Sequence, residues 1–171
     1  FSKLFSTEAE AATGLSGYYA DAAAQWAKDH WDDYNSVLLG KGYWDNGGDC
    51  ANFVSQCLLM GGMDMELYWH TSGYYAHWNP NGYDDKFEGS WIRVDELYNY
   101  LVEKGARVIV NPSAADVSIG DVILYAKTKA SDKTHSAIVA DKVNGVPKIA
   151  YHSTGTSKAF TTDWHLGFKE N

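Results

Sequence analysis

The chain has 171 residues, 45% of them hydrophobic, which is enough for one well-buried core and short for two, so we expect a single domain over residues 1–171. Acidic residues outnumber basic ones by 22 to 14, and the net charge of -8 argues against nucleic acid or an anionic membrane surface as a partner. No apolar stretch approaches the ~20 residues that span a bilayer.

The chain opens with small and polar residues, and a helical pattern follows. Residues 1–17 are predicted to form a short lead-in with some helical content around Thr7–Thr13. A first helix is predicted over Tyr18–Trp31, because apolar and aromatic side chains recur there at helical spacing. Its inward face is predicted to carry Tyr19, Ala22, Ala23, Trp26 and His30.

Two further helices are predicted downstream. The second begins at Cys50 and ends at Gly61-Gly62, a pair typical of helix C-termini. The third spans about Val94–Lys104, with an inward face formed by Val94, Leu97, Tyr98 and Leu101. Between them, residues 63–91 are rich in aromatic side chains without a regular period, and long irregular segments of this kind are often functional.

After the third helix the pattern changes to strands. Helices in the first part of the chain and strands in the second predict an α+β fold, with N-terminal helices packed on an antiparallel β-sheet. The predicted strands are Ala106–Val110, Asp121–Ala126, His135–Val143, Val146–Ser153 and a last one near Trp164–Phe168.

The run Gly47-Gly48-Asp49-Cys50 places a cysteine directly after a glycine-rich turn, at the start of a helix. Asp49 is a good N-cap residue, so Cys50 is predicted in the first turn, where free N–H groups and the helix dipole favour a thiolate and can hold an oxyanion. Most lone cysteines are apolar fillers, and Cys57, inside the apolar stripe, is expected to be one. About 10 Å of helix separates the two Cα atoms, beyond the ~7 Å limit for a disulfide. Cys50 is therefore a candidate nucleophile, although the charge of Asp49 opposes its ionisation.

Asn144-Gly145, between two strand-like runs, predicts a two-residue hairpin turn. The register from that turn pairs Ala137 with His152 and places His135 and His152 on one sheet face, with Cβ atoms ~7–8 Å apart. Cysteine catalysis needs a thiolate, a base and a group that orients the base. We therefore predict that Cys50, His135 and His152 fill these roles in that order, with His135 offsetting the charge of Asp49 through an ion pair.

Several motifs resemble one known family. They are Gly-Asp-Cys-Ala-Asn-Phe-Val-Ser-Gln around Cys50, Gly120-Asp121-Val122-Ile123, His135-Ser136-Ala137-Ile138-Val139 and Tyr151-His152-Ser153. Together they resemble the putative amidase domain family, which is related to the NlpC-like and CHAP papain-like cysteine peptidases of bacterial cell walls. The resemblance implies a papain-like (NlpC-like) fold, with Cys50 as nucleophile, His135 as base and His152 as the polar third member. Ala51 departs from the family pattern, which usually has Thr or Ser there.

Four residues are candidates for substrate binding. Tyr43 resembles the tyrosine that these peptidases place beside the nucleophile, and Asp49 adjoins the cysteine. Trp69 and Trp78 belong to the aromatic segment, whose flat rings suit glycan or stem peptide. The alternative, that these aromatic side chains only pack the segment onto the domain, stays open.

The remaining histidines give no metal-binding pattern. His70 and His77 lack the spacing of a zinc site, so no metal and no cofactor is expected. We also expect no role for His30 or His165.

The sequence thus predicts a cysteine-dependent hydrolase of amide bonds in peptidoglycan, an N-acetylmuramoyl-L-alanine amidase or a stem-peptide endopeptidase of the endolysin or autolysin kind. Peptidoglycan is the expected partner of a monomer that is secreted or wall-associated, bacterial or phage-encoded, and part of a larger protein with a wall-binding domain. Two alternatives stay open: a non-catalytic wall- or glycan-binding module, and a cysteine peptidase or transferase that acts on proteins.

Overall fold

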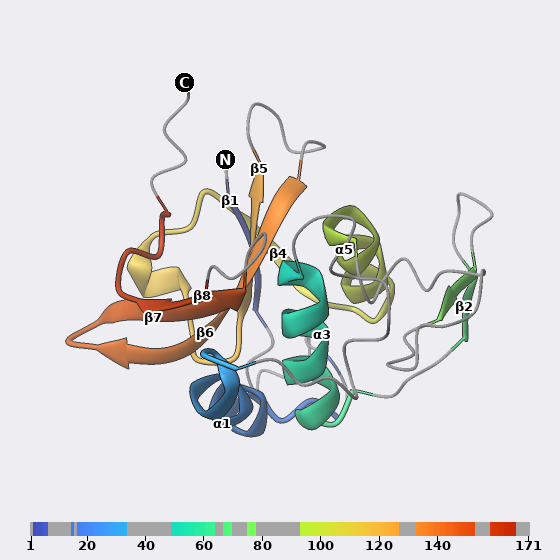
Figure 1. Cartoon of the computed structure of the whole chain (residues 1–171). Helices are drawn as coiled ribbons and strands as arrows, with labels where there is room; N and C mark the ends of the chain where they lie inside the picture. The colour runs from blue at the N-terminus through green and yellow to red at the C-terminus, as the bar shows by residue number, and fades with distance from the viewer. Residues whose placement is uncertain are drawn as a thin grey trace.

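The computed structural model describes residues 2–6, 15, 17–33, 49–63, 67–69, 75–77, 93–126, 133–152 and 158–166. Over these residues the fold is α+β: three α-helices pack against one face of a six-stranded antiparallel sheet (Figure 1). The strand order is β4-β1-β5-β6-β7-β8. A separate two-stranded sheet, β2 with β3, lies beyond α5 and away from the large sheet (Figure 1).

The helices lie close to where the sequence predicts them. They are α1 (Ala20–His30), α3 (Cys50–Met60) and α5 (Val94–Glu103). Helix α3 ends at Gly61 as expected. The inward face of α5 is confirmed except that Tyr100, rather than Tyr98, is fully buried. The predicted face of α1 is wrong in part, because the residues it buries are Ala23, Ala24 and Ala27.

The strands confirm most of the predicted pattern and correct two parts of it. The lead-in contains a strand, β1, which pairs with β4 on one side and β5 on the other; Thr7–Thr13 lies outside the described residues. Residues 164–166, in the predicted last strand, form a turn, and the last strand of the described residues is β8; residues 167 and 168 lie outside them. The bounds are β1 Ser2–Ser6, β2 Leu67–Trp69, β3 Tyr75–His77, β4 Arg107–Val110, β5 Val122–Ala126, β6 Lys133–Val143, β7 Val146–His152 and β8 Lys158–Thr161.

Alternate residues of the central strands enter two different cores. On the helix side, Leu124, Ile138 and Ala150 join the main core with α1, α3 and α5. On the other side, Ile123 and Val139 pack with Trp164 in a smaller core. Because both faces of the sheet are covered, β5 and the middle of β6 are apolar without alternation.

Helix α1 lies close to its neighbours because small residues face one another. A Cβ atom added to Gly120 would come within 2.5 Å of the Ala20 Cβ, and one added to Gly61 within 2.9 Å of the Ala23 Cβ. The Tyr18 hydroxyl also donates a 2.9 Å hydrogen bond to the Gly120 carbonyl. This close approach explains why alanines, and not the larger Tyr19 and Trp26, form the buried face of α1.

The β6–β7 hairpin has the predicted turn and a different register beyond it. Asn144 and Gly145 both have positive φ angles, as a type I′ turn requires, and Lys142 lies opposite Pro147 as expected. A β-bulge at Ala140 then shifts the register by one residue, so that Val139 pairs with Ile149.

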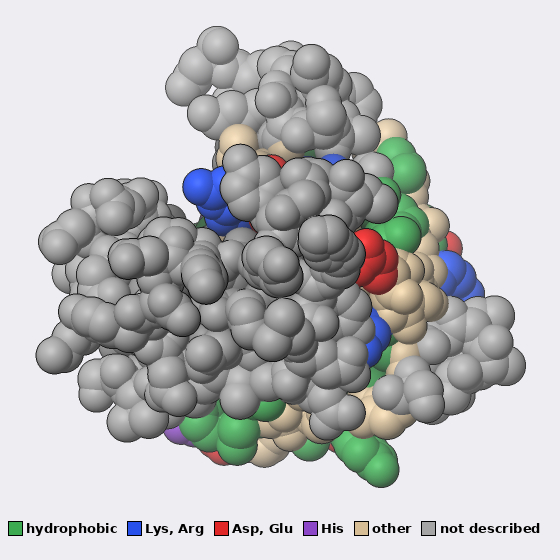
Figure 2. Space-filling view, turned by 90° about the vertical axis from the view of Figure 1, so that its right-hand side faces the viewer, with side chains coloured by type: hydrophobic (Ala, Val, Ile, Leu, Met, Phe, Trp, Pro, Cys, Tyr) green, Lys and Arg blue, Asp and Glu red, His purple; other side chains and the backbone are tan. Residues whose placement is uncertain are grey.

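Apolar and charged side chains are mixed on the surface. In the described part of the face in Figure 2, Lys or Arg and Asp or Glu side chains are interspersed with hydrophobic and uncharged ones. In the described part of the chain, no helix has the length and apolar character needed to cross a membrane.

We predict that Gly120→Ala destabilises the fold by about 2–4 kcal/mol, because it adds a clash with α1 to the strain of a left-handed backbone. Gly145→Ala is the matched control: Gly145 also has a positive φ, but an added Cβ meets nothing within 4 Å, so a loss of about 1 kcal/mol is expected. Urea unfolding of both variants measures the difference. Equal losses would contradict the close packing of α1.

Candidate active site

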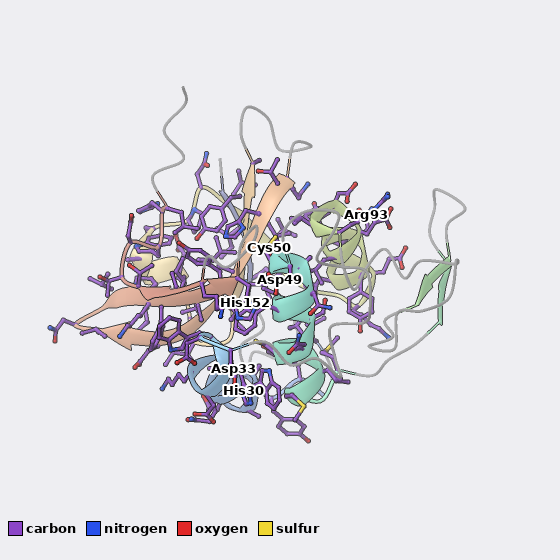
Figure 3. The ribbon with its side chains drawn as sticks, viewed as in Figure 1. His30, Asp33, Asp49, Cys50, Arg93 and His152 are labelled. Carbon is purple, nitrogen blue, oxygen red and sulfur yellow. The ribbon has the colours of Figure 1, made fainter. Side chains whose placement is uncertain are left out.

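Cys50 is the first residue of α3 and lies at the point where this helix meets β6 and β7 (Figure 3). Every residue from Cys50 to Leu58 is buried, so α3 is surrounded by protein over its first two turns. The helix begins with the Phe53 amide donating to the Asp49 carbonyl, at 2.8 Å. Asp49 thus occupies the N-cap position as predicted, but its carboxylate makes no capping hydrogen bond and is used elsewhere.

The surroundings of the Cys50 thiol raise its pKa, contrary to the expected thiolate. Burial is the largest cause, since the residue is 7% exposed, and the charge of Asp49 raises the pKa further. Ser136 and the Ala51 amide act in the opposite sense. The Ser136 hydroxyl is close enough to lower the thiol pKa, but among the described residues it has no partner with full hydrogen-bond geometry. Burial therefore outweighs the helix N-terminus, and the resting group is a thiol.

The Asp49 carboxylate binds His152 at the end of β7. Asp49 Oδ2 lies 2.8 Å from His152 Nδ1, and the two residues are 5% and 1% exposed. The other oxygen, Asp49 Oδ1, is buried without a partner among the described residues. This contact joins the first turn of α3 to the sheet, one residue before the candidate nucleophile.

Two more groups enclose the His152 ring. His152 Nε2 lies 3.3 Å from the carbonyl oxygen of His30, the last residue of α1. The Phe53 ring stacks on the imidazole with a centroid separation of 4.1 Å and an angle of 20°. Figure 3 shows His152 beside Asp49, with His30 at the adjacent end of α1. The imidazole is thus held by α1, α3 and β7 together.

His135 lies on the other face of the sheet, so the prediction that it shares a face with His152 is wrong. It pairs with Tyr125, and its ring contacts those of Tyr125 and Tyr151, with centroids 5.7 and 4.9 Å away. Both tyrosines belong to the smaller core, away from α3. The cause is the bulge at Ala140, because a one-residue shift exchanges the faces of all side chains beyond it. The arrangement does not bring His135 together with Cys50.

The other predicted site residues receive less structural definition. Tyr43 and Trp78 lie outside the described residues, and Trp69 is described only as backbone of β2. Cys57 is fully buried in the main core, as predicted, and burial raises its pKa well above the usual value. Within the described ranges, no group of three or more His, Cys, Asp or Glu side chains is placed to hold a metal ion.

Three groups at the site have no signal in the sequence. Ser136 reaches the thiol because it, and not His135, faces α3. Phe53 is one of several apolar residues of the α3 stripe, and nothing sets it apart as a ring that stacks on histidine. His30 contributes its backbone carbonyl, which any residue could supply.

Comparison with known proteins places this site in a family. The model of the putative amidase domain matches residues 17–171, which include Cys50 and His152. The chain belongs to the putative amidase domain family. It is 30% identical over 153 residues to the uncharacterized protein YjcM of Bacillus subtilis (strain 168), covering 84% of this chain and 32% of that protein. It is 31% identical over 126 residues to the uncharacterized protein YhbB of the same strain, covering 72% of this chain and 37% of that protein.

The amidase-family chain therefore spans about a third of the length of the curated relatives it matches. No solved structure matches it. Family membership indicates an amide hydrolase and leaves its substrate and mechanism open. The residues that carry out the chemistry are inferred from the site itself.

We predict that His135→Phe removes a pH dependence from the stability of this amidase-family domain. Burial lowers the pKa of His135 from 6.5 to about 4, so between these pH values the unfolded chain binds more protons and stability falls as the pH falls. A difference of about 2.5 pH units corresponds to at most about 3 kcal/mol. Urea unfolding at pH 7 and pH 4.5 should show this loss in the wild type and a smaller one in the variant. Parallel losses would contradict the buried neutral state of His135.

Proposed function

We propose that this domain is a cysteine-dependent amide hydrolase with Cys50 as the nucleophile. The observation that carries the proposal is the buried Asp49–His152 contact beside the first residue of α3, in a chain of the putative amidase family. A carboxylate, an imidazole and a thiol at a helix N-terminus are the groups that acyl transfer through cysteine uses.

The chemistry assigns a different task to each group. Cys50 Sγ attacks the amide carbonyl carbon, its proton passes to a base, and backbone amides at the N-terminus of α3 bind the developing oxyanion. The carbon–nitrogen bond then breaks as the amine takes up a proton, which leaves a thioester on Cys50. Water hydrolyses the thioester and restores the thiol.

His152 is the histidine that we propose for the proton transfers. It lies on the α3 side of the sheet, and Asp49 holds its Nδ1, which leaves Nε2 as the nitrogen that exchanges protons. Nε2 must first leave the His30 carbonyl, a contact of 3.3 Å that is long for a hydrogen bond. Catalytic hydrogen bonds often form fully only when substrate is bound.

Peptidoglycan is the proposed substrate, within the papain-like (NlpC-like) fold that the sequence motifs resemble. The proposal includes secretion or wall association, and a wall-binding region elsewhere in a longer protein. The length of the curated relatives is compatible with such further regions.

Replacing Cys50 with Ala should lower the release of soluble fragments from purified cell walls by about 10³-fold or more. Cys57→Ala is the matched control, because it removes the other thiol from the core and should change activity by no more than about twofold while costing about 1–2 kcal/mol of stability. Mass spectrometry of the released fragments identifies the bond that is cut.

Wall sedimentation and casein cleavage, measured beside fragment release, separate the alternatives. Sedimentation with walls that persists in Cys50→Ala, without any fragment release by the wild type, would favour a wall-binding module. Cleavage of casein without wall lysis would favour a peptidase that acts on proteins. Unchanged wall lysis by Cys50→Ala would overturn the cysteine mechanism.

The two histidines should differ in their effect on activity. We expect His152→Ala to lower kcat by about 10²–10⁴-fold, the usual contribution of an acid–base group. His135→Phe should retain most of the activity, because its ring lies on the far face of the sheet. The reverse result would support the role that the family resemblance gives to His135 and contradict the assignment to His152.

A further inference from the structure

Both ring nitrogens of His152 face oxygen atoms that accept hydrogen bonds. Nδ1 faces the Asp49 carboxylate at 2.8 Å, and Nε2 faces the His30 carbonyl at 3.3 Å. A neutral imidazole carries one N–H and one lone pair, so it would turn a lone pair toward one of these oxygens. An imidazolium carries two N–H groups and satisfies both.

The remaining surroundings also suit a cation. The His30 carbonyl lies at the C-terminus of α1, where the helix dipole is negative, and it also accepts a hydrogen bond from the Asp33 amide at 3.3 Å. The Phe53 ring lies nearly parallel to the imidazole, which allows a cation–π interaction. The carboxylate adds its negative charge to this contact, in which both side chains are buried.

Among the described residues, the other ionisable groups near His152 do not reverse this balance. Lys158 lies opposite His152 on β8, but its ammonium group donates to the Asp32 carbonyl at 3.0 Å, also near the end of α1. Cys50 is a neutral thiol at rest because burial raises its pKa. The His30 ring turns to Trp26, on which it stacks, with Nδ1 3.0 Å from the Trp26 carbonyl.

We propose that Asp49 and the C-terminal carbonyl of α1 hold His152 as an imidazolium in the resting site, with Asp49 as its positioning residue. This proposal rests on the proposed function, since it describes the resting state of the same site. The resting site then contains a thiol and an imidazolium, one proton more than the reaction requires. That proton must pass to solvent before Cys50 can attack, so activity rises with pH.

The protonation of His152 can be measured without any activity. In ¹⁵N-histidine-labelled Cys50→Ala protein at pH 7, we expect both ring nitrogens of His152 to carry a proton, with the signals assigned through His152→Gln. One unprotonated ring nitrogen would overturn the proposal, whether the missing proton lies on Asp49 or is absent. This result stands even if the domain proves to have no hydrolase activity.

The role of Asp49 can be tested through the pH profile. Asp49→Asn removes the charge that raises the Cys50 pKa and stabilises the imidazolium, so the acid limb of kcat/KM for wall fragments should move down by about one pH unit. Because His152 loses its anchor, kcat should fall as well. Asp141→Asn is the matched control: it removes the same charge from a partly exposed position on β6, where the carboxylate pairs with Lys28 on α1, and the limb should not move.

A loss of kcat with an unmoved acid limb would show that Asp49 is only structural and would overturn its positioning role. Thermal unfolding of Asp49→Asn establishes that the variant is folded. If it is not, the spectrum of the Cys50→Ala protein alone decides the protonation of His152. Absence of wall hydrolysis by the wild type, with a doubly protonated His152, would refute the proposed function and leave the imidazolium in place.

Discussion

The extra residue at Ala140 determines which side chains of the sheet meet α3. Without this bulge, the turn at Asn144-Gly145 would fix a register that places His135 and His152 on one face. With the bulge, Ser136 and His152 face α3, and the His135 ring packs against Tyr125 and Tyr151 at the smaller core on the opposite side of the sheet. The composition of the candidate site therefore depends on one unpaired residue of β6, Ala140, close to the turn at Asn144-Gly145.

Asp49 serves the backbone and the site in different ways. Its carbonyl begins α3, while its carboxylate binds His152 and opposes ionisation of the neighbouring thiol. A residue chosen only for capping would direct its side chain to the free amides of the first turn. Here the side chain binds His152 instead, and the Ala51 amide of the first turn lowers the pKa of the Cys50 thiol.

The sequence predicted most helices and strands because their patterns are local. Glycine ends α3, apolar residues at helical spacing mark α5, and Asn144-Gly145 specifies a turn by its own backbone preferences. It did not predict the bulge, since Ala137 to Ala140 is apolar on both faces and no alternation records the register. It missed β1 for a related reason, because that strand is defined by distant partners in β4 and β5. The position of Cys50 was predicted, whereas its neutral state follows from burial, which no local motif reveals.

The contact of α1 with Gly120 has a consequence for how this domain tolerates change. Gly120 fixes where α1 begins, and the other end of the same helix presents the carbonyl that receives His152. A rigid helix transmits a displacement from one end to the other, so a shift at Gly120 would also move the carbonyl that contacts His152. Substitutions at Gly120 should therefore alter the contact of His152 as well as the stability of the fold. Residues at the two ends of α1 should vary together among related sequences.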